Sequence, residues 1–291
     1  MELIHDIETL RGYVKLNAST DWDTYRPFLR DAQETYITPY FGEALLETIA
    51  NDENDKLRER IFRALAPFSL ALATHELSIN FGETGHTVTR TDKLAPASDA
   101  KIKLATESLL ERAWNNLDGA IRYVSMNTQK YTDWNESEYS KLVGTALFGN
   151  YNDFQDNGLV DISYSPLTFS RLRMLIIRIE KSETFRLLPA HYVYEGNTEM
   201  LSAMQAYTAS RVAELHTNAD RDNNLRDAPP IMLIHEEGAD SKNYYATQAN
   251  FWKSKITELL IADDAIEDNR EVKVNGSDKT IFFAGGSRID N

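Results

Sequence analysis

Residues 25–39 read YRPFLRDAQETYITP, and the interpretation of the whole chain starts from this stretch. Its apolar side chains recur at the spacing of one helical face, which predicts a helix over residues 23–37 that ends at Pro39. Pro27 suits such a helix only in the first turn, where no backbone N–H is needed. The apolar positions are Tyr25, Phe28, Leu29, Ala32 and Tyr36.

Residues 169–189, FSRLRMLIIRIEKSETFRLLP, repeat this pattern loosely. Both stretches carry a Glu-Thr-aromatic triplet, at residues 34–36 and 183–185, and both reach a proline soon afterwards. Each is followed by a longer apolar helix, an extended segment and a third helix with one tryptophan. We therefore predict a mainly α-helical protein with two three-helix modules in tandem. A chance likeness between two helical regions is the alternative.

The expected divisions follow from this repeat. They are helical module 1 at residues 1–130, a connector at 131–165, helical module 2 at 166–269, and a C-terminal hairpin and tail at 270–291. Helices are expected over 6–15, 23–37, 55–80, from Ser98 to about Val124, near 137–147, and over 166–187, 197–217 and 241–262. Extended insertions are expected at 81–97 and 218–237. Pro67 lies inside the second long helix and is expected to kink it.

The C-terminal segment differs from both modules. Residues 271–283, EVKVNGSDKTIFF, alternate around a turn sequence and predict a β-hairpin. An apolar edge of this kind tends to pair with another chain. We expect it to contact a neighbouring subunit or partner, and a hairpin folded back on its own domain is the alternative. The expected contact residues are Val272, Val274, Ile281, Phe282 and Phe283.

Composition narrows the function classes. The chain has 291 residues, 42% of them hydrophobic, which is enough for a sizeable core. It contains no cysteine, so disulfides and thiolate chemistry are excluded. Its net charge of -14 argues against a general nucleic-acid binder, which would neutralise phosphates with Lys and Arg. With no secretory signal and no run near the ~20 apolar residues needed to cross a bilayer, we expect a soluble, non-secreted chain.

Motifs with catalytic or metal-binding meaning are incomplete. His75-Glu76 suggests a zinc-binding His-Glu-x-x-His helix, but position 79 is Ile79. The glycines at 285–286 have too few residues after them to build a phosphate-binding helix. The acidic clusters at 52–55 and 263–264 lack the ligand spacing of a calcium loop. We therefore expect no catalytic site, no cofactor and no metal, and hence no enzyme.

Several stretches resemble a family of structural proteins encoded by phages and prophages of Bacteroidetes. They are FLRDAQETYITPYFG at 28–42, WNESEY at 134–139, SPLTFSRL at 165–172 and IFFAGG at 281–286. The first, preceded by LRGYV at 10–14, is also similar to the opening of the head–tail connector (adaptor) proteins of tailed phages. In those proteins a helix enters an aromatic corner that ends in glycine, here Tyr40-Phe41-Gly42. The second copy, PAHYV at 189–193, lacks that glycine.

This resemblance implies a virion protein, assembled in the bacterial host cytoplasm, that forms a helical neck ring between portal and tail. Such rings usually hold twelve copies. The implied partners are further copies of the chain, the portal protein and other neck or tail proteins. DNA would pass through without being specifically bound, and no membrane is involved. The alternative is a cytosolic helical scaffold or protein-binding module without catalytic activity. A hydrolase with a site built from distant residues is a less favoured third reading.

Overall fold

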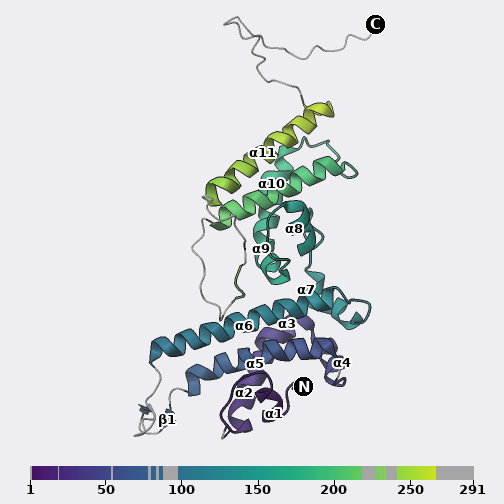
Figure 1. Ribbon diagram of the computed structural model, residues 1–291. Coiled ribbons are helices and arrows are strands. Elements are labelled where there is room, and N and C mark those ends of the chain that lie inside the picture. Colours follow the sequence, from purple (N-terminus) through teal and green to yellow (C-terminus); the bar gives the residue numbers. More distant parts are fainter. Residues whose placement is uncertain are drawn as a thin grey trace, which may run out of the picture. The chain divides into compact units, whose positions relative to one another are not determined.

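The computed structural model describes most of the chain as helices (Figure 1). The described residues are 2–18, 20–53, 55–77, 80–82, 85–87, 98–217, 226, 228–231, 233 and 241–266. They divide into two compact units. Unit 1 comprises Met1–Val143, Ser165–Arg171 and Arg221–Met232, and unit 2 comprises Gly144–Tyr164, Leu172–Asp220 and Leu233–Asn291. The expected mainly α-helical fold is confirmed.

Unit 1 is built around the long helices α5 and α6, which pack along each other, with α2 packed on α5. Its helices are α1 (Ile7–Arg11), α2 (Trp22–Ala32), α3 (Thr38–Phe41), α4 (Glu43–Ala50), α5 (Lys56–Leu77), α6 (Asp99–Ser125) and α7 (Glu138–Lys141), with the π-helix η1 (Gln33–Ile37) and the 3₁₀ helix η2 (Thr132–Glu136). A short antiparallel pair, β1 (Asn80–Gly82) and β2 (Gly85–Thr87), follows α5, with Phe81 opposite His86. This pair lies in the expected extended insertion at 81–97.

Unit 2 is built around α10 and α11, which also pack along each other, with α8 against α10. Its elements are α8 (Tyr151–Gly158), the π-helix η3 (Glu180–Thr184), the 3₁₀ helix η4 (Phe185–Leu187), α10 (Thr198–Thr217) and α11 (Ser241–Ala262). Helix α9 (Pro166–Ile179) contributes its first residues to unit 1 and the rest to unit 2. The buried side chains of unit 2 include Phe148, Phe154, Met204, Val212 and Ile256.

The expected helix over residues 23–37 does not continue as an α-helix to its end. It becomes a π-helix at Gln33–Ile37, and Thr38 then donates its hydroxyl to the Gln33 carbonyl at 3.1 Å. Pro39 does not stop the chain's helical path, because it lies at the start of α3, where its missing N–H has no partner to lose. The path ends instead at Gly42, whose φ of 75° suits glycine.

The expected helix over residues 166–187 departs from α geometry in the same place. It becomes π-helical at Glu180–Thr184 and then 3₁₀ at Phe185–Leu187. The two Glu-Thr-aromatic triplets therefore both fall at a π-turn. Such turns hold an extra residue, are rare, and often occur at functional positions.

Two prolines lie inside helices. Helix α2 begins at Trp22, so Pro27 lies in its second turn rather than its first. Helix α5 continues through Pro67. A proline there cannot donate to the carbonyl four residues earlier, at Arg63. The side-chain amide of Asn116 on α6 donates to that carbonyl at 3.1 Å instead, which is how α5 tolerates the proline.

Four elements within the described residues were not expected: α3, α4, η2 and α8. The segment 131–165, expected as a connector, is shared between unit 1, up to Val143, and unit 2, from Gly144 to Tyr164. The expected hairpin at 270–291 lies outside the described residues. No helix among the described residues is long and apolar enough to cross a membrane.

Candidate functional site

Three aromatic rings meet beside the first π-helix of unit 1. Tyr36 of η1 stacks on Phe68 of α5, with ring centroids 4.3 Å apart and planes at 9°. Trp114 of α6 meets both rings edge-on, at 5.6 Å from Tyr36 and 4.8 Å from Phe68. All three side chains are buried. This cluster packs η1, α5 and α6 against one another at one point.

Tyr36 lies within the π-turn of η1, next to Ile37. Here both Tyr36 and Ile37 are buried. The extra residue in the π-turn changes the phase of the buried stripe between α2 and α3.

A cavity of about 560 Å³ opens next to this cluster. Tyr36 and Trp114 line it, together with the half-buried rings of Phe28 and Tyr40. Burial raises the pKa of Tyr40 to about 12, although Arg171 opposes this, so its hydroxyl stays neutral at physiological pH. Four aromatic side chains thus contribute to the wall of the cavity.

Three charged residues also line the cavity. Asp31 of α2 and Glu76 of α5 are exposed carboxylates, and within the described part of the chain neither has a hydrogen bond or ion pair. Arg226 is the third, and its backbone carbonyl accepts a hydrogen bond from the Tyr36 hydroxyl at 2.9 Å. Nearby in sequence, the carbonyl of buried Pro229 accepts from Arg171. Residues 226 and 228–231 are therefore attached to unit 1.

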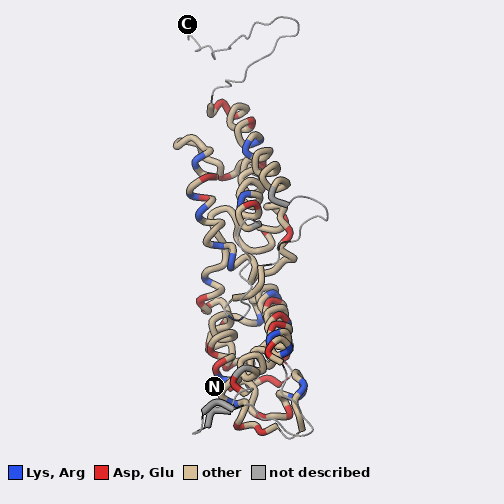
Figure 2. Tube along the Cα trace, turned by 90° about the vertical axis from the view of Figure 1, so that its left-hand side faces the viewer, with Lys and Arg blue, Asp and Glu red and all other residues tan. Residues whose placement is uncertain are grey.

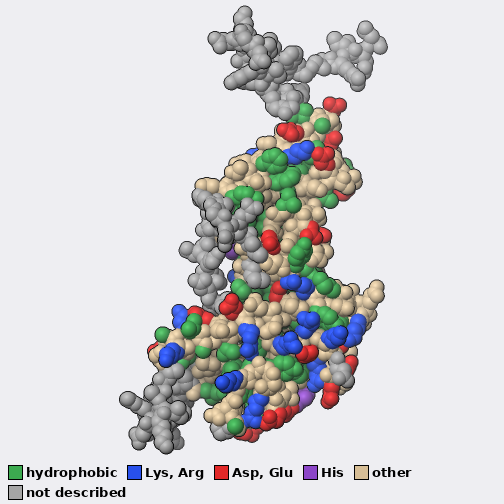
Figure 3. Space-filling view, viewed as in Figure 1, with side chains coloured by type: hydrophobic (Ala, Val, Ile, Leu, Met, Phe, Trp, Pro, Cys, Tyr) green, Lys and Arg blue, Asp and Glu red, His purple; other side chains and the backbone are tan. Residues whose placement is uncertain are grey.

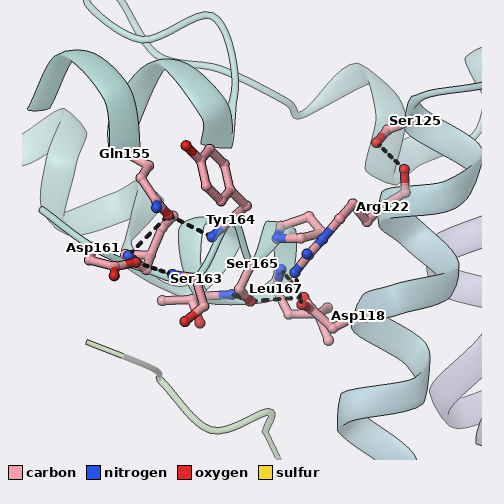
Figure 4. A network of polar contacts seen from close by, with 12 residues as sticks. Asp118, Arg122, Ser125, Gln155, Asp161, Ser163, Tyr164, Ser165 and Leu167 are labelled. Carbon is pink, nitrogen blue, oxygen red and sulfur yellow. Dashed lines mark hydrogen bonds and ion pairs between the residues drawn. The ribbon is translucent and has the colours of Figure 1, made fainter. Parts of the chain in front are cut away.

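A second polar site in unit 1 surrounds Asp118 of α6 (Figure 4). This buried carboxylate accepts from the Ser165 hydroxyl at 2.8 Å, the Leu167 backbone N–H at 3.0 Å and Arg122 at 3.4 Å. The Ser165 hydroxyl oxygen also accepts from the Thr168 N–H at 3.0 Å. The first turn of α9 is thus capped by its own serine and by a carboxylate from α6.

Figure 4 also shows a loop of unit 2 that is held by side-chain acceptors. The Gln155 side-chain oxygen accepts from the backbone N–H groups of Ile162, at 3.3 Å, and Tyr164, at 2.6 Å. Asp161 accepts from the Ser163 N–H at 2.7 Å. Ser163 and Tyr164 both have positive φ, at 54° and 50°, so these bonds hold a backbone conformation that L-residues seldom adopt.

Burial is the largest influence on Asp118 and raises its pKa, which the bonds from Leu167, Ser165 and Arg122 offset only in part. A carboxyl whose pKa is raised by folding lowers stability as pH rises from its unfolded value, about 3.9, through its folded value. We therefore expect the stability advantage of wild type over the Asp118→Asn variant to shrink as pH rises from 4 to 7.

The measurement is urea unfolding at several pH values in a Trp252→Phe background. The chain has four tryptophans, and the remaining three, Trp22, Trp114 and Trp134, all belong to unit 1. Their fluorescence therefore reports on that unit. A difference in unfolding free energy that stays constant or grows with pH would contradict the assignment.

A third polar site joins the start of α5 to the segment after α6. Asp55 accepts from Lys130 at 2.6 Å, from the Tyr131 hydroxyl at 3.0 Å and from the backbone N–H groups of Leu57 and Arg58. Burial raises the pKa of Asp55, but these hydrogen bonds together outweigh it and hold the pKa below its usual value. The site combines the N-terminal cap of α5 with an ion pair, and these contacts hold the start of α5 against the segment after α6.

In unit 2 the carboxylate of Glu180, in the π-helix η3, holds the loop that begins the unit. It accepts from the Thr145 hydroxyl at 2.5 Å and from the N–H groups of Ala146 and Leu147 at 3.3 and 3.1 Å. Gln205 of α10 donates to the Leu147 carbonyl at 2.7 Å. The second π-helix, η3, thus places the buried Glu180 carboxylate where it accepts hydrogen bonds from residues 145–147.

Each of the three buried carboxylates, Asp55, Asp118 and Glu180, accepts hydrogen bonds from backbone N–H groups at a helix start or in a loop. None of them faces an open site in the described part of the chain. The described residues contain no group of three or more His, Asp or Glu that could hold a metal ion. The side chain of His75 and all of Ile79 lie outside the described residues, as do the expected contact residues Val272 to Phe283. Sequence reasoning considered Glu76 only as part of a zinc motif and did not single out Asp31; their common cavity depends on the packing of α2 against α5.

Comparisons with known proteins find one likeness. Residues 25–142 match the model of a family described as "Family of unknown function (DUF6712)". No curated protein and no solved structure matches the chain. The matched residues include the aromatic cluster and both cavity carboxylates, but not Arg226. The chain is therefore similar to this family over most of unit 1, the part that contains the cavity.

Proposed function

We propose that the protein is a structural subunit of a phage virion, a head–tail connector or neck-ring component that joins the portal to the tail and lines the DNA path. The resemblance in residues 28–42, which ends at the Tyr40-Phe41-Gly42 corner, motivates the phage assignment. The observation that supports a building block most directly is the repeated order of local structure. The proposed role is mechanical and needs no catalytic group.

The repeat supports two three-helix modules. In unit 1 an α-helix passes into η1, which packs on α5, and α5 packs along α6. In unit 2 α9 passes into η3, which packs on α10, and α10 packs along α11. Each module would thus present one long antiparallel helix pair, braced by a π-turn.

The surface and the buried polar groups fit this role. Acidic and basic positions are interspersed along both units (Figure 2), and charged and hydrophobic side chains are scattered over the visible face of unit 1 (Figure 3). The buried carboxylates Asp55, Asp118 and Glu180 brace segments against helices. A subunit that transmits force needs internal bracing of this kind more than it needs an open cleft.

The direct test combines purified protein with a portal protein encoded in the same genome. We expect size-exclusion chromatography with light scattering to show co-assembly, and negative-stain images to show a ring on the portal. A chain that stays monomeric and does not bind the portal would contradict the proposal and would favour the cytosolic scaffold. Phage terminase and portal genes next to this gene would support it.

The expected contact segment gives a sharper prediction. Deleting Val272 to Asn291 is expected to leave thermal unfolding of the chain nearly unchanged and to abolish assembly. The full-length Ile281→Ser/Phe283→Ser variant separates the apolar contact from mere chain length and is expected to be impaired in the same assay. Normal assembly of the truncated chain would show that the contact lies elsewhere.

A further inference from the structure

We propose that the cavity beside the first π-helix binds the cationic side chain, arginine or lysine, of a basic segment in a partner protein. The proposal stands on the cavity's own geometry and charges and does not depend on the proposed function. It assigns a binding role to Asp31 and Glu76, which make no hydrogen bond or ion pair within the described part of the chain.

The walls of the cavity suit an organic cation. Cations are attracted to aromatic rings within about 6 Å, more strongly where water is partly excluded. Tyr36 and Trp114 are buried in the wall, and their stacking with Phe68 holds them in place before any ligand arrives. Leu72 adds an aliphatic surface for the methylene stem of a long side chain.

The charges of the cavity suit the same ligand. Asp31 and Glu76 come from different helices, and within the described residues neither carboxylate is paired. Arg226 contributes one positive charge, so the lining keeps a net negative charge. A guanidinium or ammonium group would gain charge-assisted hydrogen bonds from these carboxylates, whereas an anion would be repelled. A neutral apolar ligand would leave both carboxylates unused.

Unit 1 already holds guanidinium groups over aromatic rings at two other places. Arg60 of α5 lies 4.8 Å from the ring centroid of Tyr123, and Arg58 lies 4.9 Å from that of Phe62. These pairs use cations from within the chain. The cavity has the rings and two unpaired carboxylates, and therefore the capacity for a cation from outside.

The probes are N-acetyl-arginine methylamide and N-acetyl-lysine methylamide, added to the full chain. N-acetyl-citrulline methylamide is the matched control, because it has the shape of arginine without its charge. Binding is followed by NMR through the indole N–H signals of the four tryptophans. We expect both cationic probes to shift the Trp114 signal in a saturable way, and citrulline to bind at least about tenfold more weakly.

Variants test the two carboxylates. Asp31→Asn and Glu76→Gln are each expected to weaken arginine binding about fivefold or more, while Arg226→Gln, which removes a positive charge, is expected to strengthen it. Asp23→Asn on α2 and Glu111→Gln on α6 remove the same charge at exposed positions outside the cavity and should leave affinity within about twofold.

Three results would overturn the proposal. They are no saturable shift of the Trp114 signal, equal binding of citrulline and arginine, and carboxylate variants that behave like their controls. Because every substituted residue is exposed, circular dichroism is expected to show all these variants folded. Cation binding without portal binding would support this proposal and contradict the connector role. Portal binding without cation binding would do the opposite.

Discussion

Replacing Phe68 with alanine is expected to lower the unfolding free energy of unit 1 by about 3–5 kcal/mol, the usual cost of removing a buried aromatic ring. Phe68 is fully buried and contacts Tyr36 and Trp114, which come from different elements. Its loss removes the ring on which Tyr36 stacks and leaves a void where η1, α5 and α6 meet. Denaturant unfolding of the Trp252→Phe background, followed by the tryptophans of unit 1, measures this cost.

Two further variants separate the contributions to that cost. Leu104→Ala removes an exposed side chain from α6 and is expected to change stability by less than about 0.5 kcal/mol. Tyr36→Phe keeps the stacked ring but removes the hydrogen bond to the Arg226 carbonyl, and should cost about 0.5–1.5 kcal/mol. A Phe68→Ala cost below about 1 kcal/mol would mean that the aromatic cluster does not hold these elements together.

Helix positions were predictable where apolar spacing and capping residues agree. The stripe that ends near Ala262 and the serine at 241 predict the observed limits of α11, Ser241–Ala262. Asn197 was expected at the start of the helix over residues 197–217. Its side chain accepts a hydrogen bond from the Met200 N–H at 3.0 Å, just before α10 begins. Capping side chains and apolar spacing near the helix ends decide such boundaries, so they can be predicted from a single sequence.

The π-helices were not predictable in the same way. Periodicity read at 3.6 residues per turn treats residues 33–37 as one more α-turn, because an extra residue in a helix leaves no capping signal. The adjacent buried residues Tyr36 and Ile37 do not mark it either, because the α-helix α4 also buries two neighbours, Leu45 and Leu46. Helix α8 was missed for another reason: its three buried positions lie in a segment rich in Asn, Asp and Gly, although Asn150 is a good cap and accepts from two N–H groups.

The candidate site was even less accessible from sequence. Asp31 and Glu76 are 45 positions apart, and each looks like an ordinary solvent-exposed carboxylate on its own helix. Only the packing of α2 on α5 brings them to one cavity. Arg226 is still more distant in sequence and reaches unit 1 within the insertion between α10 and α11. The site therefore depends on long-range packing, which composition and residue spacing do not reveal.

The second large effect is expected at Glu180, in the π-helix of unit 2. Its side chain is buried and accepts from three donors in residues 145–147. Glu180→Ala leaves a hydroxyl and two backbone N–H groups without this partner, and a donor left unsatisfied in a buried place costs about 1–3 kcal/mol. Only the bond from the Leu147 N–H is fully buried, and the other two are partly buried. Since the loop can relax, we expect a total of about 2–4 kcal/mol. Hydrogen exchange with mass spectrometry, read on the peptides covering residues 144–148 and α10, reports it as faster opening.

Glu183, three residues later in the same π-helix, is the matched control. It bonds with Arg211 and Tyr207, and its side chain is 29% exposed. The hydrogen bond from Arg211 is the main reason that its pKa lies below the usual value, so its contribution is present at neutral pH and lost as pH falls. Solvent screening limits that contribution to about 0.5–1 kcal/mol, and Glu183→Ala should cost no more. Equal costs at the two positions would mean that the buried acceptor is not what holds residues 145–147, and that η3 presents Glu180 for some other reason than bracing. A large loss of unfolding free energy at Glu180 alone would show that η3 stabilises the unit by holding residues 145–147. The first π-helix, η1, has a comparable role because it places Tyr36 in the aromatic cluster.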